Sequence, residues 1–167
     1  MKTKTIAQML LVSGFAACFW NSQGFAAGGV HCQEVGGSIL TNFLPAANCP
    51  ESAQNLCTDG TATGDLKGAV GARILSISGN VFHVLHHWVT ESGDTIFLNE
   101  ADATNYSTPD PNHVLAVYRN GIEITGGTGR FEGATGTILS FGAADLTLGH
   151  AIFRYSGTVC FPTVKGP

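Results

Sequence analysis

Charged residues are scarce in this chain. They make up 12% of its 167 residues, and 8 Lys and Arg stand against 12 Asp and Glu. The formal net charge of −4 excludes the basic surface by which nucleic-acid-binding proteins hold phosphate groups. So few cations also argue against an anionic membrane surface as a partner. We therefore expect no nucleic-acid partner and no lipid-surface partner.

Helical periodicity is missing after the N-terminal segment, because no longer stretch repeats apolar residues at helical spacing. The chain instead has 22 Gly and many Thr, which favours short strands joined by tight turns. Its length matches one domain that can bury a core without a metal. The sequence therefore predicts a single all-β domain.

The N-terminal segment has the pattern of a signal peptide. Lys2 and Lys4 precede an apolar run over 6–20 that is too short to span a membrane. Small residues follow, and we place cleavage after Ala26, within a residue or two. We predict a signal peptide over 1–26, no membrane span, and a periplasmic or secreted protein.

A second interpretation takes Phe15-Ala16-Ala17-Cys18 as a lipoprotein cleavage box, which would leave Cys18 lipidated. Phe15 stands where such boxes favour Leu, and the bulky Phe19 and Trp20 follow the cysteine. These residues favour the signal peptide over the lipoprotein.

Removal of the leader leaves Cys32, Cys49, Cys57 and Cys160. An even number in an exported chain indicates two disulfides, for which three pairings exist. We favour Cys32 with Cys49, and Cys57 with Cys160, which would tie the first strand to the last across about a hundred residues. No Cys-x-x-Cys or His pair has the spacing of zinc ligands, so we expect no metal.

Strand patterns with turn signals fill the chain from Cys57 onward. Val81–Thr90 is the clearest strand, a turn at 91–94 leads to a partner over Thr95–Asn105, and Asn120-Gly121 predicts a two-residue hairpin. About eight strands result, enough to close an antiparallel barrel that holds side chains or one small ligand. We predict an eight-stranded antiparallel closed barrel over 57–167, preceded by an irregular, disulfide-pinned arm over 27–56.

One glycine-rich segment carries a family resemblance. Gly126-Gly127-Thr128-Gly129-Arg130-Phe131-Glu132-Gly133-Ala134-Thr135-Gly136-Thr137 resembles the signature of dirigent proteins and of the wider allene oxide cyclase-like barrel superfamily. Phe153–Gly157 is similar to the closing strand of that family. The resemblance implies an eight-stranded barrel with a ligand cavity at one end. It also implies frequent trimers, so a homotrimer or homodimer is the oligomer to test.

Candidate site residues come first from Val81–Thr90. Alternation places His86 on one face with Phe82 and Trp88, and His83 with His87 on the other. His83 and His87 would stand ~13 Å apart, too far to chelate one ion. We expect Phe82 and Trp88 to bind the ligand and His86 to take part in chemistry if there is any. Surface or half-buried sheet histidines are the alternative.

Two acids and two arginines complete the candidates. Glu100 and Asp102 share a face with Ile96 and Leu98, so an inward orientation would give the cavity two catalytic acids beside His86. The alternative is that both acids are solvated at the strand end. Arg119 with its neighbour Tyr118, and Arg154, are candidates for holding a ligand. The alternative for the arginines is surface pairing, with Glu123 as the partner of Arg119.

Three functions fit these patterns. The first is an exported barrel that binds a small apolar molecule without a cofactor. The second is a cofactor-free isomerase or cyclase of such a molecule. The third is a structural envelope module whose interior is packed, for example by residues 38–44. The absence of a recognisable catalytic motif ranks the binding protein first.

Overall fold

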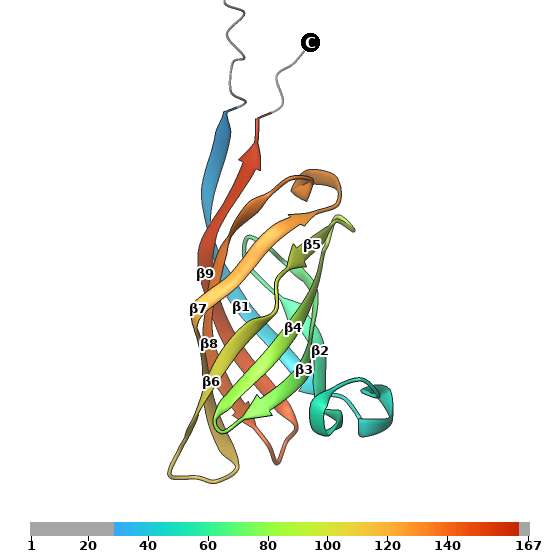
Figure 1. Ribbon diagram of the computed structural model, residues 1–167, viewed down its shortest axis with the longest axis vertical. Helices are drawn as coiled ribbons and strands as arrows, with labels where there is room; N and C mark the ends of the chain where they lie inside the picture. The colour runs from blue at the N-terminus through green and yellow to red at the C-terminus, as the bar shows by residue number, and fades with distance from the viewer. Residues whose placement is uncertain (1–28, 164–167) are drawn as a thin grey trace, which may run out of the picture.

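The computed structural model describes residues 29–163, and their regular structure is almost wholly strand (Figure 1). The strands are β1 (Val30–Phe43), β2 (Cys57–Ala62), β3 (Gly68–Ser78), β4 (Val81–Thr90), β5 (Thr95–Leu98), β6 (Ala101–Ser107), β7 (His113–Gly127), β8 (Thr135–Asp145) and β9 (His150–Pro162). Three short 3-10 turns accompany them: η1 (Ala46–Asn48), η2 (Ala53–Asn55) and η3 (Gly129–Phe131). None of these described residues forms a helix that could cross a membrane. The predicted signal peptide over 1–26 and Cys18 lie outside the described residues.

Antiparallel pairing runs around the whole molecule and closes it into a barrel. Consecutive strands pair along the chain, except β5 and β6, and β9 returns to pair with β1. Strands β5 and β6 lie end to end between β4 and β7, so they fill one position in the wall. The predicted all-β, eight-stranded antiparallel closed barrel is confirmed.

The arm predicted over 27–56 is irregular only in part. Residues 30–43 form β1, which pairs with β9 from Val30↔Pro162 to Asn42↔His150. Gly36 and Gly37, which belong to the arm predicted to be irregular, lie inside this strand. A Cβ on Gly37 would stand 2.0 Å from the Thr63 carbonyl oxygen and 2.7 Å from the Tyr155 ring, so glycine is required by close packing. Among the described residues of the arm, 44–56 form its irregular part, around η1 and η2.

The hairpin predicted at Asn120-Gly121 is wrong, because both flanking segments belong to the single strand β7. The register against β8 jumps from Tyr118↔Ser140 to Ile122↔Ile138, and Gly121 takes a φ of +76°. These features define a β-bulge that bends the strand. The bulge merges two predicted strands into one, and β1 supplies the missing wall position.

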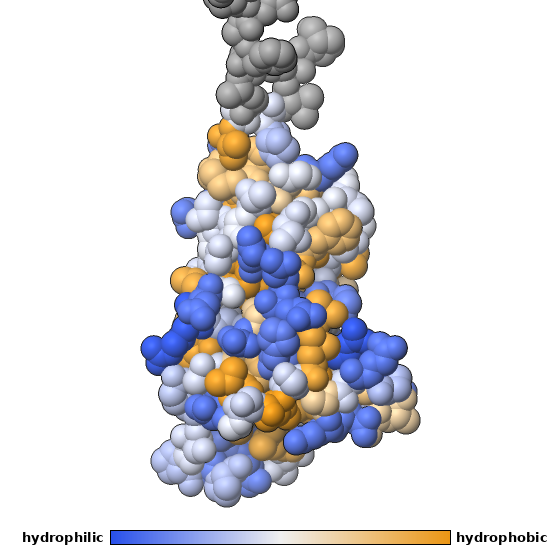
Figure 2. Space-filling view, viewed as in Figure 1, coloured by the Kyte–Doolittle hydropathy of each residue, from blue (hydrophilic) through white to orange (hydrophobic). Residues whose placement is uncertain are grey.

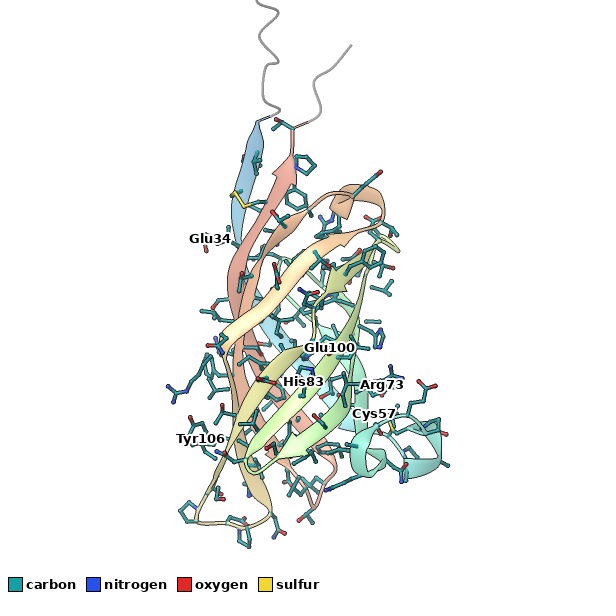
Figure 3. All side chains as sticks on the ribbon, in the orientation of Figure 1. Glu34, Cys57, Arg73, His83, Glu100 and Tyr106 are labelled. Atoms are coloured by element: carbon teal, nitrogen blue, oxygen red, sulfur yellow. A yellow bond between two sulfur atoms is a disulfide. The ribbon has the colours of Figure 1, made fainter. Side chains whose placement is uncertain are left out.

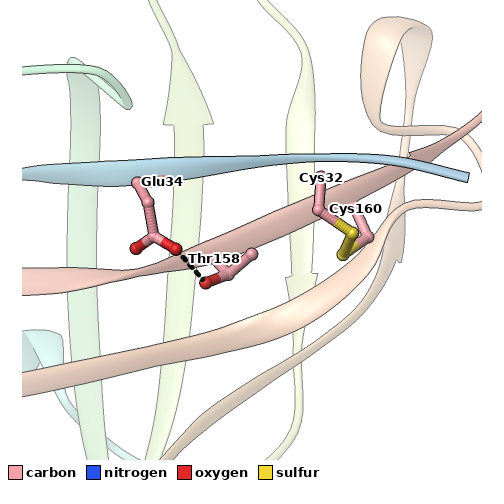
Figure 4. The surroundings of a disulfide bond; sticks show 4 residues. All are labelled: Cys32, Glu34, Thr158 and Cys160. Atoms are coloured by element: carbon pink, nitrogen blue, oxygen red, sulfur yellow. Dashed lines mark hydrogen bonds between the residues drawn. A yellow bond between two sulfur atoms is a disulfide. The ribbon is translucent and has the colours of Figure 1, made fainter.

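The disulfides also differ from the predicted pairing. Cys32 bonds to Cys160 across the seam between β1 and β9 (Figure 4), and Cys49 bonds to Cys57 at the start of β2. Because β1 is extended, roughly 36 Å of strand separates Cys32 from Phe43 at ~3.3 Å per residue. That distance keeps Cys32 away from Cys49 and brings it opposite Cys160.

The upper end of the barrel in Figure 1 is filled by side chains. The β2–β3 loop folds over it. The Leu66 N–H donates to the Tyr155 hydroxyl at 3.0 Å, and that hydroxyl donates to the Thr63 carbonyl at 2.8 Å. Trp88 Nε1 donates to the Leu66 carbonyl at 2.7 Å. Phe131, from the glycine-rich segment, lies fully buried in η3 beneath this end.

Candidate functional site

The other end of the barrel is hollow. A cavity of about 270 Å³ lies between the strands there. Little side-chain volume fills this end of the barrel, because five strands each turn a small alanine side chain toward the cavity. These residues are Ala72, Ala103, Ala116, Ala144 and Ala151. Phe82 and Phe153 supply the larger apolar surface. The predicted ligand residue Phe82 therefore lines a cavity.

A smaller space of about 60 Å³ lies deeper in the barrel. It shares the side chains of Tyr118, Phe153 and Thr41 with the larger cavity, so the two spaces adjoin. His86 and Trp88 line only the deeper one. Among the described residues that line the two spaces there is no Asp, Glu, Lys or Arg. A bound molecule would therefore meet mostly apolar groups and no carboxylate, ammonium or guanidinium.

His86 and Tyr118 form a hydrogen-bonded pair at this depth. His86 Nε2 lies 3.0 Å from the Tyr118 hydroxyl, and the rings meet edge to face with centroids 5.1 Å apart. Burial, with a smaller contribution from the neighbouring His87, lowers the pKa of His86 to about 4. Burial likewise raises the pKa of Tyr118 above its ordinary value. Both side chains are therefore neutral at physiological pH.

Glu100 and Asp102 do not line the interior, contrary to the inward orientation considered from sequence. The alternation expected over Thr95–Asn105 is broken, since the register against β4 runs from Trp88↔Ile96 to Val84↔Ala101. The six residues 96–101 thus lie opposite only the five residues 84–88 of β4. The extra residue turns Ala101 inward and leaves the two acids exposed, as the solvated alternative held.

The two acids hold His83 on the outer surface instead. Asp102 Oδ1 lies 2.8 Å from His83 Nδ1, and Glu100 Oε2 lies 2.8 Å from His83 Nε2. These two hydrogen bonds are the main cause of a raised His83 pKa. Figure 3 shows His83 beside Glu100, and Figure 2 shows a hydrophilic band across the same region.

The two candidate arginines also lie outside the barrel. Arg119 donates through Nε and Nη2 to the Tyr106 hydroxyl at 3.1 and 2.7 Å. Glu123, its expected partner, instead accepts from Asn99 Nδ2 at 2.6 Å. Arg154 is exposed on β9, opposite Phe141 of β8. Of the predicted ligand residues, the structure brings Phe82, Trp88 and Tyr118 to the interior and leaves Arg119 and Arg154 outside.

One feature of the cavity mouth was missed from sequence. His113 Nδ1 lies 2.9 Å from Asp110 Oδ2, and His113 Nε2 lies 3.3 Å from Asp145 Oδ2. These contacts join the β6–β7 and β8–β9 connections, next to the cavity residues Val114 and Leu146. The Asp110-x-x-His113 spacing was the available signal, but the partner on the other connection was not predictable from it. The described residues contain no group of three His, Cys, Asp or Glu side chains placed to hold a metal.

No family model matches the sequence, and no curated protein matches it. A solved structure of a pterocarpan synthase dirigent protein aligns with a TM-score of 0.37 and 12% identity, over 83% of this chain and 89% of that one.

Proposed function

We propose that the protein is an exported barrel that binds one small apolar molecule in its interior, without a cofactor. The observation that best supports this proposal is the hollow cavity of about 270 Å³, which no charged side chain of the described residues lines. An apolar cavity of about 150 Å³ suffices for benzene, and sites for drug-sized ligands begin near 300 Å³. A molecule of one or two rings, or an equivalent aliphatic, fits between these limits.

Export is supported by the two disulfides, which form and persist in oxidising compartments. Together with the signal-peptide pattern over 1–26, they support a periplasmic or secreted location. Membership of the dirigent-like or allene oxide cyclase-like superfamily is part of this proposal and depends on the Gly126–Thr137 segment.

A cofactor-free isomerase or cyclase is the second candidate. The buried His86–Tyr118 pair favours it, since a neutral imidazole can exchange a proton with a substrate. The acids Glu100 and Asp102 lie outside, however, so the described residues that line the cavity offer no carboxylic acid as a partner. Binding therefore ranks above catalysis. The packed envelope module ranks last, because residues 38–43 belong to the wall strand β1 and leave the interior open.

A homotrimer or homodimer is also proposed, as the family resemblance implies. Leu40, Phe141 and Ile152 are exposed on the outer face of the neighbouring strands β1, β8 and β9. A second copy of the chain would remove their apolar surface from water. Light scattering of the purified protein measures the oligomer, and a monomer at micromolar concentration would contradict it.

The binding proposal is tested by filling the cavity. Ala103→Phe places a ring among the inward alanines, whereas Ser107→Phe adds the same ring at an exposed position of the same strand. We expect naphthalene, followed by its fluorescence, to bind wild type and S107F but not A103F. Circular dichroism checks that each variant is folded. Native mass spectrometry of protein from its own envelope fraction should show a small-molecule adduct. Absence of naphthalene binding and of any adduct would contradict the proposal.

A further inference from the structure

The His86–Tyr118 pair has two hydrogen-bond donors, but only one of them has an acceptor among the described residues. A neutral imidazole carries one N–H and a tyrosine one O–H, so the pair has two donor hydrogens. Their mutual hydrogen bond at 3.0 Å uses one of them. Within the described residues Tyr118 has no other partner, and His86 Nδ1 is buried with none at all. One donor hydrogen is therefore left over.

The surroundings of Nδ1 indicate which donor that is. An N–H at Nδ1 would be enclosed by protein without an acceptor, the costly kind of unsatisfied buried group. The tautomer with its hydrogen on Nε2 avoids this cost, because Nε2–H then donates to the Tyr118 oxygen. The Tyr118 O–H is released from His86 in this arrangement. Tyr118 lines both the deep space and the larger cavity, so its hydrogen is available there.

The lining also limits the acceptor. No Lys or Arg among the described residues lines either space, and no histidine lines the larger one, so a carboxylate held there would lose its hydration without a counter-charge. The Ser140 hydroxyl, which lines the deep space, already donates to the Arg154 carbonyl at 3.2 Å. The fitting ligand is uncharged and mostly apolar, with one acceptor oxygen.

We propose that the Tyr118 hydroxyl, oriented by His86, hydrogen-bonds the oxygen of a neutral apolar carbonyl compound held in the cavity. This inference rests on the proposed binding function and specifies its ligand class. It assigns Tyr118 to ligand contact and His86 to positioning. In an apolar site the one hydrogen bond discriminates between molecules of the same shape.

A matched set of probes tests the proposal on the wild-type protein. Acetophenone and ethylbenzene have nearly the same shape, but only acetophenone has an acceptor oxygen, and benzoate replaces the ketone with a charge. We expect calorimetry to show acetophenone binding about tenfold more tightly than ethylbenzene, as one hydrogen bond allows, with no binding of benzoate. Equal affinities for acetophenone and ethylbenzene would overturn the inference and leave apolar binding standing. Binding of neither would overturn both proposals.

Variants then test the assigned residues. Tyr118→Phe should bring the acetophenone-to-ethylbenzene ratio to about one, and the double variant H86L/Y118F should do the same without leaving an unpaired imidazole. Tyr106→Phe is the matched control, since Tyr106 is exposed and bonded to Arg119. A preference retained in both cavity variants would overturn the role of Tyr118.

Infrared spectroscopy gives a readout that needs no variant. The carbonyl stretch of carbonyl-¹³C acetophenone should have a lower frequency when the ketone is bound to the wild-type protein than when it is dissolved in a hydrocarbon solvent. A bound carbonyl with the hydrocarbon frequency would contradict the hydrogen bond.

Discussion

Cys32 and Cys160 stand directly opposite each other on β1 and β9 and are joined by a disulfide. This bond crosses the seam at which the first and last strands close the barrel. It spans a sequence separation of 128, against 8 for Cys49–Cys57. The two bonds therefore constrain the unfolded chain very differently.

Loss of the seam disulfide should cost more stability than loss of the other. Loop-entropy arguments give a decrease in unfolding free energy of about 5 kcal/mol for C32A/C160A and about 2.5 kcal/mol for C49A/C57A. Urea unfolding of both variants measures the difference, and peptide mapping under non-reducing conditions checks the pairing. Similar losses in the two variants would argue against the seam as the principal constraint.

The Tyr155 hydroxyl should hold the closed end of the barrel. Tyr155→Phe removes the acceptor of the Leu66 N–H and the donor to the Thr63 carbonyl. A buried N–H without a partner costs about 1–3 kcal/mol, so unfolding free energy should fall by that amount. Amide exchange at Leu66 should accelerate at the same time. Tyr106→Phe is the exposed control, and an equal effect in both variants would contradict the assignment.

Much of the wall was predictable from local pattern. Val81–Thr90 has the predicted bounds of β4, and its alternation grouped Phe82 with Trp88 on the face that the structure turns inward, opposite His87. Alternation works there because β4 runs without a bulge of its own. The turn at 91–94 follows from Gly93, and β5 begins at Thr95 as predicted.

The errors share one physical origin, which is that pairing partners distant in the chain override local signals. Gly36-Gly37 looks like a loop until Tyr155 packs against it, and Asn120-Gly121 looks like a hairpin until β8 pairs on both sides of it. The break at Asn99-Glu100 reversed the faces of the two acids in the same way. Whether a side chain faces the cavity depends on such shifts in strand register, so the site was less predictable than the fold.

His83 should stabilise the fold most at lower pH. Its two carboxylate partners raise its pKa above 6.5 in the folded protein, so the folded state binds the proton more tightly than the unfolded state. This contribution is fully present below pH 6.5 and is lost as pH rises through the folded pKa. His83 is partly exposed, so added salt should weaken the effect. NMR titration gives the pKa, and unfolding free energy in wild type minus that in His83→Gln should fall with rising pH. A pH-independent difference would contradict the prediction.

His86 should change the unfolding free energy with pH in the direction opposite to His83, and over a lower pH range. Burial lowers its pKa from 6.5 to about 4, so the unfolded chain takes up a proton before the folded protein does. Its neutral form therefore contributes stability above pH 6.5, and this contribution declines as pH falls toward about 4. The full shift corresponds to roughly 3 kcal/mol. His86→Phe should lose less stability than wild type between pH 7 and 4, as urea unfolding at each pH would measure. Imidazole NMR shifts of His86 that titrate near 6.5 would show water around the ring. Such a result would also weaken the proposed ligand contact, because water beside the ring could accept the hydrogen bond from the Tyr118 hydroxyl.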